Sequence, residues 1–346
     1  METNIQVFKQ KLNDIDISSV SNDLLVTNYL KNIFEQQDYY LKIYSWVLNN
    51  VLNKSTPKVE NISMLDFGCG NGLFAIFAKY CGVGKVYGCD FNANFVEAAS
   101  VLANKMNIEV DGWFVCNEDE LYKKCNTLKL DIVAGTDVIE HIYNLNTFFK
   151  NIHLLNHQML TAFTTASVYE NYFKRKALYK LMHQDEYVGS NILEATSKDE
   201  FAGMPYLEIR KKLIANNFEE LNTEQTNLLA KATKGLRKDD IITAVNRYLK
   251  NGILPLPQSN KHNTCDPITG NFTERMLLLK EYKKLYSEFK FELNIYSGFY
   301  AADGNKLKAF LQTILNKFIT INHNTVISRI FAPLILLVGT PHKKIL

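Results

Sequence analysis

Features that would place a protein in a secreted or membrane-spanning class are missing from this sequence of 346 residues. No two of its six cysteines form a CxxC pair, and five of them fall within residues 69–125, where several should be buried on strands. This usage favours a reduced, cytoplasmic protein. The longest apolar stretch, residues 330–339, is too short to cross a bilayer and contains Pro333. The N-terminal residues mix charges and amides without the apolar core of a signal peptide.

A strong charge imbalance is also missing. The formal net charge is +3, with 47% hydrophobic and 22% charged residues, which is typical of an ordinary soluble globular protein. This balance is too mild to indicate a nucleic-acid binder, and neither a nucleic-acid nor a membrane partner is expected. No internal repeat or low-complexity tract is present. The length allows one elaborated domain or two modest ones.

Strand-like and helix-like segments alternate along the first half of the chain. The expected strands cover residues 62–67, 85–90, 111–116, 130–137 and 159–167, and helical patterns follow the first, second and fourth of them. Such alternation predicts an α/β domain with a mostly parallel sheet covered by helices on both faces.

The alternation of strands and helices divides the chain into four segments. The segment 1–60 reads as helical, and 61–168 contains the alternating core. Residues 169–270 form a mostly helical insertion, in which Ser197 and Glu200 suggest a capping box and Pro205 the first turn of a helix. The segment 271–346 supplies one more helix and two final strands, near residues 289–300 and 332–339.

Three glycines stand together between the first expected strand and its helix, in the stretch MLDFGCGNGLFAIFA. Without Cβ atoms, Gly68, Gly70 and Gly72 let the chain turn tightly and let a ligand approach the backbone. The following helix points unpaired N–H groups into the crevice beyond the carboxyl ends of the strands. In an open α/β sheet this crevice is where ligands bind.

An acidic residue ends the next strand. Asp90 lies about twenty residues downstream, where a carboxylate accepts hydrogen bonds from both hydroxyls of a ribose. The pair of features therefore predicts a nucleoside-type ligand. Nicotinamide sites usually space their glycines as GxGxxG, whereas this chain has GxGxG preceded by Asp66.

At this point LDFGCGNG resembles motif I of the class I S-adenosylmethionine-dependent methyltransferases, and VYGCD resembles their acidic motif II. The segment LDIVAGTDVIEHI is similar to the region after strand four in the small-molecule branch related to ubiquinone-biosynthesis O-methyltransferases. The resemblance covers about residues 62–167. It implies a Rossmann-like seven-stranded sheet with an antiparallel last strand, and S-adenosylmethionine as cofactor.

The resemblance also implies roles for single residues. Asp66 should orient the amino-acid end of the cofactor, Asp90 should hold the ribose, and Phe91 should lie near the adenine. Asn117 stands where relatives more often have Asp, so Asn117, Glu118 or Asp119 should lie near the adenine. The complete implied cofactor site is Asp66, Gly68, Cys69, Gly70, Gly72, Asp90, Phe91, Asn117, Glu118, Asp119 and Thr136.

Candidate catalytic residues follow the fourth strand. Asp137, Glu140 and His141 have the spacing of one helical face. Three interpretations stay open. The cluster caps and packs its loop, or His141 is a general base for a hydroxyl, or a carboxylate and the imidazole hold a divalent metal. No spacing supports a further ligand from another histidine, so no metal site is predicted.

We therefore expect a cytoplasmic methyltransferase that transfers a methyl group from S-adenosylmethionine to an oxygen, or a nitrogen, of a small-molecule acceptor. The N-terminal helices and the insertion should build the acceptor pocket. Two alternatives are an RNA 2′-O-methyltransferase, for which the insertion offers lysines, and a nonenzymatic S-adenosylmethionine-binding partner subunit.

Overall fold

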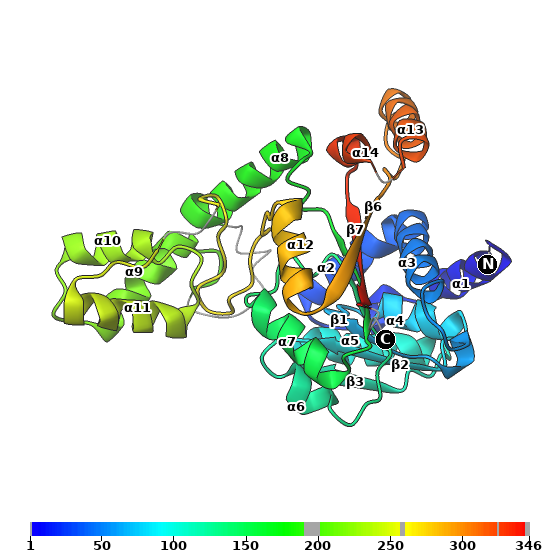
Figure 1. The fold of residues 1–346 in the computed structure, drawn as a ribbon, viewed down its shortest axis with the longest axis horizontal. Helices are drawn as coiled ribbons and strands as arrows, with labels where there is room; N and C mark the ends of the chain where they lie inside the picture. Colours follow the sequence, from blue (N-terminus) through cyan, green and yellow to red (C-terminus); the bar gives the residue numbers. More distant parts are fainter. Residues whose placement is uncertain (1, 190–200, 257–259, 324, 343–346) are drawn as a thin grey trace. The chain divides into compact units, whose positions relative to one another are not determined.

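In the computed structural model the chain forms two compact units (Figure 1). Unit 1 consists of Met1–Ile139, Asn144–Ala166 and Leu279–Leu346. Unit 2 consists of Glu140–Tyr143 and Ser167–Leu278. The structure describes residues 2–189, 201–256, 260–323 and 325–342.

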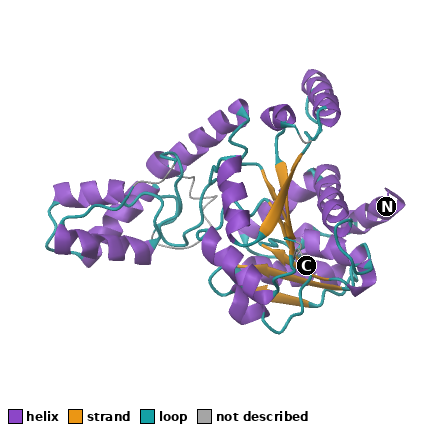
Figure 2. Cartoon of the chain, viewed as in Figure 1, coloured by secondary structure: helices purple, strands orange, loops and turns teal. Residues whose placement is uncertain are grey.

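Unit 1 is built on a seven-stranded sheet, drawn in orange in Figure 2. The strand order is β3-β2-β1-β4-β5-β7-β6, and β7 is antiparallel to both of its neighbours. This confirms the predicted fold class, including the antiparallel strand. The strands are β1 (Ser63–Phe67), β2 (Lys85–Asp90), β3 (Gly112–Val115), β4 (Ile132–Thr136), β5 (Leu160–Thr165), β6 (Phe291–Ser297) and β7 (Ile335–Pro341).

Helices cover both faces of this sheet because alternate strand residues point to opposite sides. On one face, Met64, Ala162 and Val338 join a buried cluster with side chains of the first five helices, such as Phe77 and Leu102. These helices are α1 (Glu2–Asn13), α2 (Leu24–Glu35), α3 (Gln37–Leu52), α4 (Leu73–Tyr80) and α5 (Ala93–Lys105).

The opposite face of the sheet is covered by aromatic side chains. The ring centroid of Phe148 lies 4.5 Å from that of Phe67 and 5.5 Å from that of Phe163. The centroids of the Phe149 and Tyr286 rings are 4.6 Å apart. The helices on this side are α6 (Leu121–Cys125), α7 (Leu145–Leu155) and α12 (Leu279–Glu288).

The connection from β6 to β7 leaves the sheet at the edge where the parallel strands end. Ile335, the first residue of β7, pairs with Thr165 at the end of β5 and with Ser297 at the end of β6. The connection contains α13 (Lys306–Ile321) and α14 (Val326–Phe331). It therefore starts and ends at the ligand-binding edge expected for such sheets.

Unit 2 is mainly helical. Its core packs Ile214, Leu229 and Val245 together, one from each of three helices. Pro205 is the N-cap of one of them rather than a residue of its first turn, and the predicted capping box at Ser197 and Glu200 lies outside the described residues. The elements are α8 (Tyr172–His183), the π-helical segment η3 (Gln184–Val188), α9 (Tyr206–Asn217), α10 (Thr223–Ala232) and α11 (Lys238–Asn251).

A buried ion pair joins four segments of unit 2. The Arg210 guanidinium on α9 pairs with Glu186 in η3, and its Nε donates to the carbonyl of Ala230 at 2.8 Å. Thr264 Oγ1 donates to Glu186 Oε2 at 2.6 Å. Both charged side chains are almost completely buried, so their mutual hydrogen bonds replace those that water would make.

None of the helices in the described ranges is long and apolar enough to cross a membrane.

Candidate active site

The three glycines form a left-handed turn between β1 and α4. Their φ angles are 71°, 50° and 75° for Gly68, Gly70 and Gly72, values that residues with a Cβ rarely adopt. The amides of Gly68 and Cys69 both donate to the carbonyl of Cys89, at 2.8 and 2.9 Å. The turn is therefore tied to the end of β2, the strand that carries Asp90.

Close packing explains two of these glycines independently of any ligand. A Cβ on Gly68 would overlap Val138, and a Cβ on Gly72 would lie 2.5 Å from Trp113 and 2.6 Å from Ala99. The space at Gly70 is less crowded, because its nearest neighbour is Tyr29 Cε1 at 3.2 Å. Gly70 is thus the glycine at which the turn is most open.

Asp90 points toward this turn. Its Oδ2 accepts from the Gly70 amide at 3.0 Å, and its Oδ1 accepts from the Asn92 amide at 2.9 Å. Burial raises the pKa of Asp90, and these backbone bonds oppose that shift. The Phe91 amide opposes it as well, and of the roughly four acceptor positions of a carboxylate at least one remains for a hydroxyl of a ligand. The expected proximity of turn and carboxylate is present.

Asp66 is buried behind the turn. Its Oδ2 accepts from the amide of Ala75 in the first turn of α4, at 3.1 Å. Burial raises the pKa of Asp66 to about 8, with a further contribution from Asp90, while the Ala75 amide opposes the shift. Asp66 therefore joins the strand to the helix that follows the turn.

Cys69 and Phe91 differ in exposure. The Cys69 side chain is buried, and burial raises the pKa of its thiol well above the ordinary value, so the sulfur is protonated and unreactive. Phe91 follows Asp90 directly and is 48% exposed. Its ring is available to a planar ligand beside the Asp90 carboxylate.

The three residues expected near an adenine have different partners. Glu118 is buried, and its Oε1 accepts from the Asn144 amide at 3.1 Å just before α7. Asn117 Oδ1 accepts from the amides of Asp119 and Glu120, both at 3.1 Å. Glu118 thus faces α7, whereas Asn117 and Asp119 form the turn that follows β3.

The prediction that Asp137, Glu140 and His141 share one face of a helix is wrong. Residues 137–141 form a turn, because Asp137 has a φ of +57° and its amide donates to the Thr164 carbonyl and hydroxyl at 3.3 and 3.1 Å. Thr136 ends β4 opposite Thr164. Asp137 is exposed and belongs to unit 1, whereas Glu140 and His141 belong to unit 2.

Within unit 2, His141 is held by the segment around Phe272. Its Nδ1 lies 2.7 Å from the Phe272 carbonyl oxygen, and its own carbonyl accepts from the Phe272 amide at 3.1 Å. A carbonyl only accepts, so Nδ1 carries the hydrogen and Nε2 of the neutral ring is an acceptor. Glu140 is fully buried, and its backbone carbonyl accepts from Arg275 at 3.0 Å.

The described residues contain no group of three or more His, Cys, Asp or Glu side chains arranged to hold a metal ion. Within this part of the chain, the metal-binding interpretation of the 137–141 segment therefore has no additional ligand.

Tyr29 on α2 was not among the predicted site residues. Its ring lies beside Gly70 and is 39% exposed. The pKa of its phenol is raised, first by desolvation and then by the carboxylates of Asp137, Asp90 and Asp66. Tyr29 therefore stays protonated as a hydrogen-bond donor near the carboxyl ends of three strands. No local motif marks it, since it lies on an ordinary amphipathic helix.

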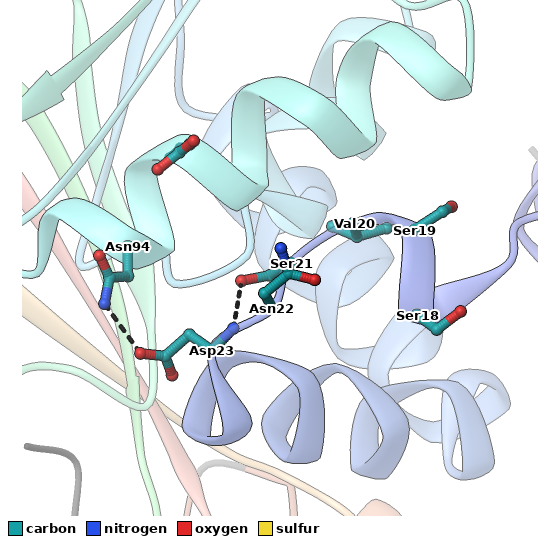
Figure 3. A pocket seen from close by; sticks show the side chains of 8 residues that line it. Ser18, Ser19, Val20, Ser21, Asn22, Asp23 and Asn94 are labelled. Carbon is teal, nitrogen blue, oxygen red and sulfur yellow. Dashed lines mark hydrogen bonds between the residues drawn. The ribbon is translucent and has the colours of Figure 1, made fainter.

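A polar groove of about 340 Å³ lies between the start of α2 and α5 (Figure 3). Asp23 crosses it: Oδ1 accepts from the Val26 amide at 3.1 Å, and Oδ2 accepts from Asn94 Nδ2 at 2.8 Å. Ser21 Oγ accepts from the Asp23 amide. These groups satisfy one another, so the groove is a structural link between α2 and α5.

Comparison with known proteins agrees with this geometry. Residues 36–188 match a family model described as a methyltransferase domain. The chain contains a class I S-adenosylmethionine-dependent methyltransferase domain. The methyl donor of this class is S-adenosylmethionine.

The methyltransferase domain is similar to two kinds of curated protein. It is 29% identical over 100 residues to the ubiquinone biosynthesis O-methyltransferase of Pelagibacter ubique, covering 29% of this chain and 39% of that protein. It is 32% identical over 98 residues to the ribosomal protein L11 methyltransferase of Dictyoglomus thermophilum, covering 27% of this chain and 29% of that protein. The matches thus span well under half of these relatives.

Among solved structures, the chain is similar to a geranyl diphosphate C-methyltransferase from Streptomyces coelicolor, with 9% identity and a TM-score of 0.41, covering 88% of this chain and 81% of that one. A magnesium protoporphyrin IX methyltransferase from Synechocystis has 13% identity and a TM-score of 0.37, with 91% and 87% coverage.

Proposed function

We propose that this protein transfers a methyl group from S-adenosylmethionine to an oxygen, or a nitrogen, of a small-molecule acceptor. The observation that carries the proposal is the contact between the glycine turn and Asp90, whose Oδ2 accepts from the Gly70 amide at 3.0 Å. This contact places a carboxylate with a spare acceptor position beside an open stretch of backbone.

The residues of unit 1 fit the donor. Asp90 has an acceptor position for a ribose hydroxyl, Phe91 offers an exposed ring for an adenine, and Tyr29 offers a phenol donor near Gly70. When bound, the donor supplies an electrophilic methyl carbon on a sulfonium. The protein must align an acceptor atom with that carbon and remove a proton when the acceptor carries one.

His141 is the residue that we assign to proton removal. Because Phe272 holds the hydrogen of the neutral ring on Nδ1, Nε2 is free to accept the hydroxyl or amine proton. With the donor bound, Nε2 would take the proton from an acceptor atom placed against the methyl carbon. Glu140 is fully buried and Asp137 is exposed, so we assign neither as the base.

The test is transfer of radiolabelled methyl groups from S-adenosylmethionine into a fractionated cell extract. Label in a small-molecule fraction is expected, and His141→Gln should lower the rate by about 10²–10⁴-fold. The affinity for S-adenosylhomocysteine should change less than about twofold, because the hydrogen bonds of His141 lie in unit 2. His157→Gln, an exposed histidine in unit 1, is the matched control and should leave the rate unchanged.

Other outcomes contradict the proposal. Label confined to RNA or to protein identifies a macromolecular acceptor. Binding of S-adenosylhomocysteine without label in any fraction identifies a nonenzymatic binding subunit.

A further inference from the structure

The two helices between β6 and β7 expose large apolar side chains. On α13 these are Leu307, Phe310, Leu311, Ile314, Phe318 and Ile321, with exposed fractions from 38% to 83%. On α14 they are Val326, Ile327, Ile330 and Phe331, from 37% to 63%. We call these ten residues the α13–α14 surface. A contiguous exposed apolar patch of this kind marks an interaction site more often than an ordinary surface.

The exposed residues of α13 lie on one side of the helix. Each residue advances about 100° around an α-helix, so these six side chains fall within a stripe roughly 100° wide. Lys306 and Lys317 lie along one border of the stripe, and Lys308 lies along the other. Lys308 pairs with Asp303 at 3.4 Å, whereas Lys306 and Lys317 have no Asp or Glu within residues 304–331.

The other side of α13 has partners within unit 1. Asn316 Oδ1 accepts from the Tyr300 amide at 2.7 Å, and Asn316 Nδ2 donates to the Tyr300 carbonyl at 3.0 Å. Ile319 on this side is buried, while within the α13–α14 surface the centroids of the Phe318 and Phe331 rings lie 5.2 Å apart and join the two helices. These contacts fix how the helix is rotated, so the stripe faces outward.

We propose that the α13–α14 surface binds the face of an anionic lipid bilayer. An apolar stripe bordered by lysines matches such an interface, because the apolar side chains enter the acyl boundary while the lysines reach the negative headgroups. A second copy of the chain is a poorer partner, since a symmetric pair would bring the same lysines together. The proposal departs from the sequence-based expectation of no membrane partner.

The position of this surface bears on the reaction. Residues 298–334 leave and re-enter the sheet at Ser297 and Ile335, on the edge where β1, β2 and β4 end with the glycine turn, Asp90 and Thr136. Docking would therefore hold the ligand-binding edge at the bilayer. If the proposed function is correct, on which this step rests, the acceptor is an amphiphile that resides in the membrane surface.

Sedimentation with vesicles tests the docking surface in the full-length protein. Binding to vesicles of phosphatidylcholine with phosphatidylglycerol should exceed binding to phosphatidylcholine alone by about tenfold or more, and it should weaken with salt. Leu311→Ser with Ile314→Ser should lower binding roughly tenfold or more. The matched control is Ile253→Ser with Leu256→Ser, which alters exposed apolar residues outside the surface and should have no effect.

Charge reversal separates the electrostatic contribution to vesicle binding from the apolar one. Lys306→Glu with Lys317→Glu should abolish the preference for anionic vesicles, whereas Lys54→Glu with Lys58→Glu, at two exposed positions elsewhere, should preserve it. Equal binding to both vesicle types, unchanged binding of the Ser variants, or a dimer lost in those variants without vesicle binding would overturn the proposal. Titration with S-adenosylhomocysteine on the same samples reports on folding and tests the donor site separately.

Discussion

The two units of this protein position polar side chains in different ways. In unit 1, Asp66, Asp90 and Thr136 lie at or near the ends of neighbouring strands, where backbone amides hold the two carboxylates and strand pairing places the threonine. In unit 2, the Glu186 side chain pairs with Arg210 and Thr264, and the His141 ring with the Phe272 carbonyl, so the chain positions are 24 to 131 residues apart. A sheet places its functional groups by regular geometry, whereas the helical unit needs particular long-range pairs.

The largest effect should come from breaking such a pair. Glu186→Ala leaves the buried Arg210 guanidinium and the Thr264 hydroxyl without their acceptor, and it should lower the stability of unit 2 by about 3–5 kcal/mol. Hydrogen exchange should report the loss in α9 and η3, while binding of S-adenosylhomocysteine persists.

Glu208→Ala is the control for this loss. It removes an exposed partner of Lys211 on the same helix and should cost no more than about 0.5 kcal/mol. Equal effects of the two substitutions would show that the buried pair does not organise unit 2.

The next largest effect should occur in the turn of unit 1. Gly68→Ala forces a Cβ into Val138 at a φ of +71°, and it should destabilise the protein by at least about 2 kcal/mol more than Gly82→Ala. Gly82 also has a positive φ, but it has nothing within 4 Å of an added Cβ.

Chemical unfolding measures this difference, and Val138→Ala should recover part of it by removing the overlapping methyl groups. If Gly68→Ala and Gly82→Ala cost the same, close packing is not what requires a glycine at position 68.

Asp90→Ala should weaken binding of S-adenosylhomocysteine by about 10- to 100-fold in isothermal titration, because a carboxylate acceptor for hydroxyls is lost. Asp90→Asn, which keeps an acceptor near Gly70, should give an intermediate loss. Glu109, an exposed carboxylate of unit 1, provides a control at which Ala should not alter the affinity. An unchanged dissociation constant in Asp90→Ala would remove this residue from the donor site.

The smallest effect, taken per pH unit, concerns the pH dependence of stability. Because burial raises the pKa of Asp66 to about 8, the folded protein holds a proton that the unfolded chain releases near pH 4. Stability should therefore fall as pH rises between these values, by at most about 1.4 kcal/mol per pH unit, and this contribution should level off above pH 8.

Asp66→Asn should remove this slope. Urea unfolding at pH 5.5, 6.5 and 7.5 measures it, because these values, roughly two pH units in span, lie between the unfolded and the folded pKa. Parallel slopes for the variant and the natural protein would assign the pH dependence to other groups.

Sequence patterns predicted the sheet well because its signals are local. The glycine turn marks the end of β1 and Asp90 the end of β2, and the antiparallel β7 followed from the resemblance. The conformation of the segment after β4 was harder to predict. Asp137 adopts a left-handed conformation stabilised by Thr164, 27 residues away, and the periodicity of DVIEHI does not show this contact.

Tyr29, the Phe272 carbonyl and the α13–α14 surface were not predicted for a related reason. Tyr29 meets Gly70 and Phe272 meets His141 only after the chain has folded, so no spacing reveals either contact. The apolar residues of α13 are as periodic as those of a buried helix. Only the structure shows that the stripe faces outward.

The most direct test of the account is a crystal structure of the protein with S-adenosylhomocysteine. The ribose hydroxyls should lie within hydrogen-bond distance of the Asp90 carboxylate, with the adenosyl group along the turn from Gly68 to Gly72. A nucleoside bound elsewhere, or an empty turn at saturating ligand, would contradict it.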